Sequence, residues 1–103
     1  MQYCSVYITT ENKEEARRIG KTLVEEKLAA CVNIYPVESI YRWEGNIEED
    51  IEAAMLVKTK AGLVEKVINR VRELHSYEVP CIVSLPIEKG NPEYLKWIEE
   101  STR

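Results

Sequence analysis

Hydrophobic and acidic residues alternate between positions 46 and 57, and this pattern predicts one long β-strand. The acidic residues Glu48, Asp50 and Glu52 take even positions. A period of two is typical of a strand with one buried face. At Ala54 and Leu56 the even positions become apolar as well, so we expect burial on both faces from there on. The odd positions carry Ile47, Ile51, Ala53, Met55 and Val57.

The preceding segment, Cys31–Trp43, is rich in β-branched and aromatic residues and predicts the partner strand. Pro36 cannot donate to a strand ladder, so this strand should be an edge strand or contain a bulge. The two strands should fold around Trp43-Glu44-Gly45-Asn46, with Gly45 in the left-handed region. Cys31–Trp43 would extend about 43 Å, whereas a domain of this size is roughly 33 Å across. We therefore expect the hairpin of residues 28–60 to project and to pack on another subunit.

The remaining segments predict two more strands and three helices. Residues 3–9 form a first strand, and residues 81–86 form a short apolar strand after a loop at 75–80. Asn12 and Glu15 suggest a capping box at the start of the first helix. Asn91 followed by a proline suggests the start of the last helix. The apolar helical stripes are Ala16, Ile19, Gly20, Leu23 and Val24; then Leu63, Val64, Val67, Ile68, Val71 and Leu74; then Tyr94, Trp97 and Ile98.

This order, βαββαβ with a C-terminal helix, predicts an α+β fold. Right-handed crossovers and a central hairpin indicate a four-stranded antiparallel sheet with two helices on one face, the ferredoxin-like arrangement. No helix is assigned to the other face of the sheet. We expect neighbouring subunits to cover that face together with the long hairpin.

Composition narrows the class of protein. With 103 residues the chain is predicted to form a single domain over residues 1–103. A net charge of -4 argues against nucleic-acid binding, which usually needs a basic face. No apolar run is long enough for a membrane helix, and the first residues do not resemble a signal peptide. Three widely spaced cysteines suit free thiols in a reducing cytosol. We expect a cytoplasmic protein.

Candidate chemistry is sparse, and each candidate has a structural alternative. His75 is the only histidine, which excludes a Ser/His/Asp or two-histidine metal site within one chain. His75 and Glu78 share one loop and could contact a metal or small ligand; alternatively, His75 interacts with the end of the preceding helix. Cys31 is either a thiolate ligand or a small buried residue. Cys4 and Cys81, within strand segments, are expected to be buried.

Other polar and aromatic groups are open to two interpretations as well. The carboxylates of residues 44–52 could bind a hard cation, although a solvated acidic edge that discourages strand pairing is favoured. Lys58 either meets an anion at a subunit boundary or extends to the surface. Tyr41, Trp43 and Trp97 are expected to anchor subunit contacts rather than form a binding cage. An enzyme is the weakest hypothesis because no cofactor motif is present, and no catalytic residue is predicted.

Five segments together resemble the divalent-cation tolerance (CutA) family. They are EEKLAACVN (residues 25–33), SIYRWEGNIEED (39–50), LVKTK (56–60), HSYEVPCIVSLPI (75–87) and NPEYLKWI (91–98), and the likeness extends over nearly the whole chain. The resemblance implies a ferredoxin-like subunit in a homotrimer in which long hairpins wrap onto neighbours. It also implies kinship with the PII signalling proteins, a role in tolerance to copper and other divalent metals, and no agreed catalytic activity.

The resemblance also suggests where ligands bind. The copper site proposed for bacterial members uses a cysteine near the end of the first strand and two adjacent histidines after the second helix. The matching positions here are Thr9, Leu74 and His75. Only one of the three ligands is retained, which argues against a high-affinity copper site within one subunit, although three subunits could together supply ligands.

The sequence thus predicts a homotrimeric metal-tolerance protein that binds Cu²⁺, another divalent cation or a small ligand weakly between subunits. The alternative is a PII-like signalling or scaffold trimer that binds an anionic metabolite or a protein partner. The predicted metal residues are His75, Cys31 and Glu78. The resemblance implies a ligand cleft that contains Tyr41, Trp43, Lys58 and Tyr77.

Overall fold

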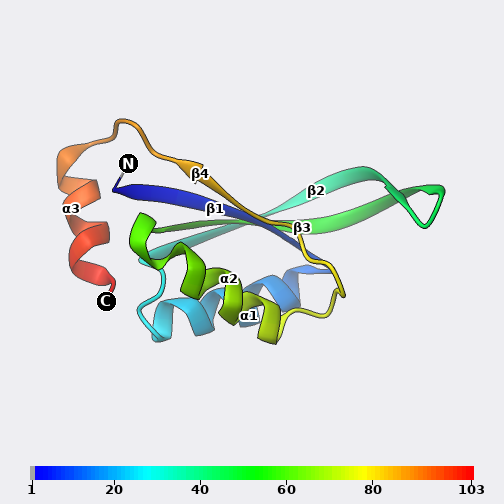
Figure 1. The fold of residues 1–103 in the computed structure, drawn as a ribbon, viewed down its shortest axis with the longest axis horizontal. Coiled ribbons are helices and arrows are strands. Elements are labelled where there is room, and N and C mark those ends of the chain that lie inside the picture. The colour runs from blue at the N-terminus through cyan, green and yellow to red at the C-terminus, as the bar shows by residue number, and fades with distance from the viewer. Residues whose placement is uncertain (1) are drawn as a thin grey trace.

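The computed structural model describes residues 2–103, which form one sheet and three α-helices (Figure 1). All the predicted elements are present, with boundaries that differ by no more than a few residues. In chain order they are β1 (Tyr3–Thr10), α1 (Lys13–Glu25), β2 (Cys31–Trp43), β3 (Asn46–Lys60), the short 3₁₀ helix η1 (Ala61–Leu63), α2 (Val64–Leu74), β4 (Ile82–Pro86) and α3 (Pro92–Ser101).

The sheet has the strand order β2-β3-β1-β4, and every neighbouring pair is antiparallel. This confirms the α+β prediction of a four-stranded antiparallel sheet. Helices α1 and α2 lie together on one face, while α3 packs at the end of the sheet beside the start of β1 (Figure 1). Strand β2 is an edge strand, and Pro36 pairs in continuous register with Ala53. Proline is therefore accommodated by the free edge and not by a bulge.

The core lies between the sheet and the two helices. Alternate residues of β1, among them Val6 and Ile8, are fully buried against α1, whereas their neighbours on the opposite face are only half-buried. The first helix begins with Asn12, whose side chain accepts a hydrogen bond from the amide of Glu15. The Glu15 carboxylate accepts from the amide of Glu11, one residue before the cap. The expected capping box is thus present in a shifted form.

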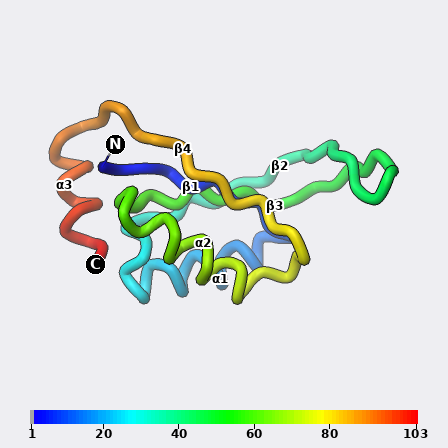
Figure 2. Tube along the Cα trace, viewed as in Figure 1, coloured from blue at the N-terminus to red at the C-terminus, as the bar shows by residue number. Residues whose placement is uncertain are grey.

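The β2–β3 hairpin projects well beyond the helices, as its length predicts. The molecule measures 44 × 25 × 21 Å, and the hairpin forms its long arm (Figure 2). Trp43 pairs with Asn46, and the two residues between them have positive φ angles of 50° at Glu44 and 83° at Gly45. Two consecutive positive φ angles are typical of the type I′ turn that matches the strand twist.

One burial prediction for β3 is wrong for the single chain. The side chains of Ile47 and Ile51 are 66% and 79% exposed, although their positions alternate with acidic residues as in a buried face. The reason is geometric: burial on this face begins at Ala53, where α1 covers the sheet, and the two isoleucines lie further out on the arm. No helix among residues 2–103 is long and apolar enough to cross a membrane.

Candidate functional site

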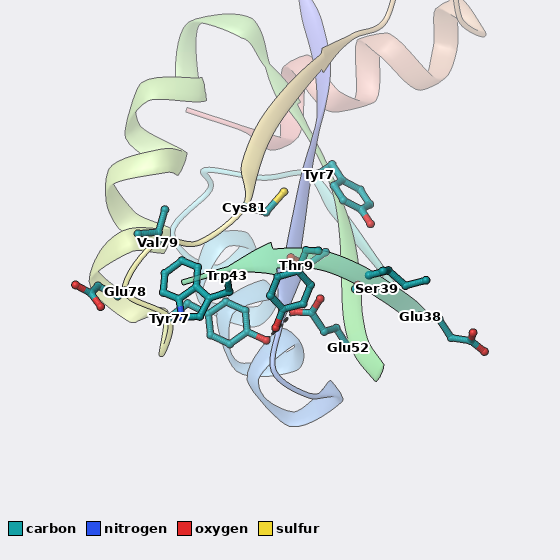
Figure 3. Close-up of a pocket in the computed structure, with 12 residues that line it drawn as sticks. Tyr7, Thr9, Glu38, Ser39, Trp43, Glu52, Tyr77, Glu78, Val79 and Cys81 are labelled. Atoms are coloured by element: carbon teal, nitrogen blue, oxygen red, sulfur yellow. Dashed lines mark hydrogen bonds between the residues drawn. The ribbon is translucent and has the colours of Figure 1, made fainter. Parts of the chain in front are cut away.

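A cavity of about 660 Å³ opens where the projecting hairpin leaves the body of the sheet (Figure 3). Its walls come from β1, from both arms of the hairpin, and from the loop between α2 and β4. Three of the four residues predicted to line a ligand cleft are among them, whereas Lys58 is not. The lining residues are Tyr7, Thr9, Glu38, Ser39, Ile40, Tyr41, Trp43, Glu52, Tyr77, Glu78, Val79 and Cys81.

The centre of the cavity holds a hydrogen bond between the α2–β4 loop and the hairpin. The Tyr77 hydroxyl donates to Glu52 Oε2 at 2.6 Å, and the two side chains face each other in Figure 3. Glu52 is only 9% exposed. Burial, together with the hydrogen bond to Glu52 and the charge of that carboxylate, raises the pKa of Tyr77. The phenol therefore stays neutral at physiological pH and acts as a donor.

A second tyrosine is held in the same way nearer the tip of the hairpin. Tyr41 on β2 pairs with Glu48 and donates its hydroxyl diagonally to Asp50 Oδ2. This hydrogen bond, with a smaller contribution from burial, raises the pKa of Tyr41 to about 12. Two phenols thus direct their protons at two carboxylates of β3. The resulting site is aromatic and acidic, and its lining contains no lysine or arginine.

The centre of the His75 ring lies 4.8 Å from that of the Tyr77 ring, and the His75 side chain is fully enclosed, with an exposure of 0%. Its Nδ1 accepts from the Tyr77 amide at 3.0 Å, so Nδ1 carries no proton and the proton sits on Nε2. The Nε2–H group then donates to the Thr9 carbonyl oxygen at 2.8 Å. Both ring nitrogens are therefore engaged, and the imidazole fixes the start of the loop that carries Tyr77.

The carboxylate of Glu15 completes the support of this loop. It lies 4.0 Å from His75 Nδ1 and accepts from the Ser76 amide at 2.7 Å. Burial would raise the pKa of Glu15, but the hydrogen bonds from Glu11 and Ser76 outweigh it, so that the pKa is lowered. Glu15 is thus an ionised acceptor that joins α1 to the α2–β4 loop.

The three predicted metal ligands do not converge within one chain. Across the sheet, Cys31 of β2 lies opposite Lys58 of β3, and Lys58 lies opposite Ser5 of β1. His75 instead makes a hydrogen bond to the carbonyl of Thr9, further along β1. Ser5 and Thr9 are four positions apart along β1, or about 13 Å. Glu78 lines the cavity but turns its carboxylate outward (Figure 3). Within residues 2–103, no group of three or more His, Cys, Asp or Glu side chains is arranged to hold a metal ion.

Lys58 lies on the sheet face that α1 and α2 do not cover, here called the open face, but away from the cavity. It contacts the side-chain oxygen of Asn33, which is also 3.9 Å from the Cys31 thiol. Lys58 and Glu52 are six positions apart along β3, or about 20 Å. The predicted ligand cleft is therefore divided in the single chain, with the aromatic residues at one end and the lysine at the other.

The cavity also contains residues that sequence reasoning did not select. Glu52 was assigned to a solvated acidic edge but is almost completely buried. Its place at the boundary between the acidic and apolar halves of β3 was a usable signal. Cys81 was expected to be buried, yet it is exposed and lines the cavity, because β4 begins only at Ile82. Tyr7 carried no sequence signal beyond its strand position.

Comparison with known proteins gives one consistent family. A family model described as "CutA1 divalent ion tolerance protein" matches residues 4–101. The Divalent-cation tolerance protein CutA of Archaeoglobus fulgidus is 51% identical over 96 residues, covering 93% of this chain and 94% of that protein. The corresponding protein of Thermus thermophilus is 55% identical over 98 residues, covering 94% and 95%.

Solved structures agree with the sequence comparison. The periplasmic divalent cation tolerance protein CutA from Archaeoglobus fulgidus superimposes with a TM-score of 0.95 at 49% identity, over 96% of this chain and 97% of that one. The Thermus thermophilus divalent cation tolerance protein also gives 0.95, at 53% identity, over 98% and 99%. By contrast, this chain spans only 56% of the length of Protein CutA 1, chloroplastic, of Oryza sativa, to which it is 44% identical.

Proposed function

This chain belongs to the CutA1 divalent ion tolerance protein family, and on that premise we propose that it acts in divalent-metal tolerance, copper included, as a homotrimer. In this proposal the trimer binds a divalent cation or a small ligand weakly at clefts between its subunits. It works by binding and not by catalysis, since the one histidine has both nitrogens occupied by backbone groups.

One observation carries the proposal: the hairpin and the open face of the sheet are incomplete in a single chain. Ile40, Ile47 and Ile51 are each more than half exposed on the arm. On the uncovered sheet face, Val83 and Leu85 of the edge strand β4 are also exposed. A sheet with two free edges and large exposed apolar side chains is a typical subunit surface. A neighbouring copy would supply the missing cover.

The metal part of the proposal places the ligands in different subunits. Cys31, His75 and Glu78 do not fit one ion within a chain. In the proposed trimer, the half-exposed Cys31 thiol of one copy and the exposed Glu78 carboxylate of another would serve as ligands of a common ion. His75 can join only if Nδ1 gives up its bond from the Tyr77 amide. Weak binding is therefore expected, because ligation competes with a structural hydrogen bond.

Two measurements test this function. Light scattering at micromolar concentration should give the mass of three chains, and a monomer mass would overturn the assembly. Calorimetric titration with Cu²⁺ and with Zn²⁺ at neutral pH should show weak binding that Cys31→Ser and Glu78→Gln each reduce. Exposed Glu65 on α2 provides the matched control, Glu65→Gln. If neither Cu²⁺ nor Zn²⁺ binds, the metal site is rejected. If His75→Ala binds the metal with unchanged affinity, His75 is rejected as a ligand.

A second candidate function is a PII-like signalling or scaffold trimer. The observation in its favour is Lys58, a cation on the open face that contacts Asn33 and forms no ion pair within residues 2–103. An anionic metabolite or a protein partner could bind there across a subunit boundary. A thermal-shift screen with anions discriminates the two, because a bound ligand raises the melting temperature by mass action. Shifts with metals alone would reject this candidate.

We also propose a cytoplasmic location. The proposal is supported by the three cysteines, which are all free thiols, because a reducing compartment keeps thiols in that state. Fractionation of the source cells with an antibody against the chain would test the proposal, and recovery outside the cytoplasm would reject it.

A further inference from the structure

We propose that the cavity beneath the hairpin binds a small organic cation, namely a protonated or quaternary amine attached to a compact apolar body. The inference rests on the small-ligand part of the proposed function and names the chemistry of that ligand. All the residues that carry it lie in one chain, so it can fail while trimerisation and metal binding stand.

The first argument is charge. The cavity is lined by three carboxylates and by no lysine or arginine. Glu38 and Glu78 turn outward at opposite ends, and Glu52 alone points into the centre (Figure 3). Glu52 Oε2 accepts from Tyr77, while Oε1 accepts no hydrogen bond from residues 2–103 and is reached by the solvent in the cavity. A largely buried carboxylate with one oxygen open to the cavity and no cation in the lining favours a positive ligand.

The second argument is the aromatic wall. Four rings line the same cavity: Tyr7 from β1, Tyr41 and Trp43 from the hairpin, and Tyr77 from the α2–β4 loop. Aromatic faces attract cations electrostatically, and several rings around a carboxylate are the usual recognition site for quaternary ammonium groups. The hydroxyl protons of Tyr41 and Tyr77 point at carboxylates, which leaves the ring faces as the available surface.

Competing ligand classes fit the cavity less well. An anion would meet negative charge and would find the two phenolic protons already donated. A divalent cation would need several inward oxygen ligands, but only one carboxylate points inward (Figure 3). A volume of about 660 Å³ is typical of a site for a small organic molecule. Charge, ring content and size therefore agree on an organic cation.

Choline and its neutral isostere 3,3-dimethyl-1-butanol are the matched probes. Binding is read as a change in the fluorescence of Trp43, in a Trp97→Phe background that leaves one tryptophan. Choline should give a saturable change, and the isostere should bind at least about tenfold more weakly because it lacks the charge. Equal responses to the two probes, or no response to choline, would overturn the proposal.

Two variants locate the binding. Glu52→Gln should weaken choline binding about tenfold or more through loss of the buried charge, and Tyr41→Leu should weaken it through loss of one ring. The control is Glu49→Gln, which makes the same charge change on the same strand but outside the cavity lining. If Glu49→Gln and Glu52→Gln weaken binding equally, the attraction is diffuse and the pocket assignment is rejected.

A neighbouring subunit could instead fill the pocket with its own Lys58. In that case wild type would not bind choline, whereas Lys58→Met would, and this outcome also overturns the proposal for the native protein. Light scattering and Cu²⁺ titration of the same samples separate the failures. Loss of choline binding in a metal-binding trimer rejects only the organic-cation site, while a monomer mass rejects the proposed assembly.

Discussion

The hydroxyl of Tyr77 donates to the carboxylate of Glu52 at 2.6 Å and so links the α2–β4 loop directly to the hairpin arm. The two residues are 25 positions apart in sequence and belong to elements that share no strand pairing. The bond therefore joins two walls of the cavity. Glu52 is also the residue at which burial of β3 begins.

We expect Tyr77→Phe to destabilise the fold by about 1.5–3 kcal/mol, the usual range for a hydrogen bond to a charged group. The control is Tyr41→Phe, which removes a comparable bond to Asp50. Because Asp50 is exposed, water can replace the lost donor, and the cost should be clearly smaller than for Tyr77→Phe. Urea unfolding at one fixed protein concentration measures both. Equal costs would show that the burial of Glu52 has no energetic consequence.

The second prediction concerns acid stability and Glu15. Its pKa is lowered from the ordinary 4.5 in the folded chain, so ionised Glu15 stabilises the fold above pH 4.5. That contribution is lost as the pH falls through the lower folded-state pKa. Glu15→Gln should therefore reduce the free energy of unfolding at pH 7 and flatten its decline in acid. The matched control is the exposed Glu14→Gln in the same helical turn.

Urea titrations at pH 7 and at a series of decreasing pH values give the comparison, since wild type loses the contribution of Glu15 as the pH falls to and below its lowered folded-state pKa. Wild type and Glu15→Gln should converge there, whereas Glu14→Gln should follow wild type throughout. A Glu15→Gln profile that stays parallel to wild type would mean that the hydrogen bonds to Glu11 and Ser76 do not distinguish the ionised form.

The elements of the fold could be predicted because local signals are strong and mutually consistent. Alternation in β3, the cap at Asn12, and the Asn91-Pro92 start of α3 each specify structure within a few residues of sequence. The length of Cys31–Trp43 even predicted the projecting arm. These features depend on local backbone preferences and periodicity, which the sequence displays directly.

The site was less predictable because it depends on long-range geometry. Glu52 has the same parity as Glu48 and Asp50, and only the α2–β4 loop folding over it makes it buried. His75 is an attractive metal ligand by type, but its bonds to Thr9 and Tyr77 show a structural role that no spacing reveals. Ile51 is the opposite case: its place in the alternating pattern predicts burial, but the single chain leaves it exposed.

The third prediction tests the turn at the tip of the hairpin. Gly45 has φ +83°, and no atom lies within 4 Å of the position that a Cβ would take, so Gly45→Ala adds backbone strain without a clash. The expected cost is about 1–2 kcal/mol. Gly62 also has open space around it but no positive φ, so Gly62→Ala is the matched control and should be neutral or slightly stabilising. Thermal unfolding of both variants gives the comparison, and equal melting temperatures would argue against a strained turn.

The last prediction asks whether the arm is an assembly element. Ile51 lies on the same face of β3 as Ala53 but further out on the arm than α1 reaches, and it is 79% exposed in the single chain. If a neighbouring subunit buries it, Ile51→Lys places a charge in an apolar contact, which costs several kcal/mol when the charge has no partner. The oligomer should then dissociate at micromolar concentration. The fold of each chain should persist, because Ile51 is outside the core cluster.

Asn69→Lys provides the control, since it makes the same change in charge at an exposed position on α2. Light scattering should show the native mass for Asn69→Lys and a smaller mass for Ile51→Lys, with similar circular dichroism. A native mass for both variants would mean that Ile51 remains in water. In that event the exposed isoleucines would no longer support the assembly, and the open face of the sheet would be the remaining candidate for the subunit contact.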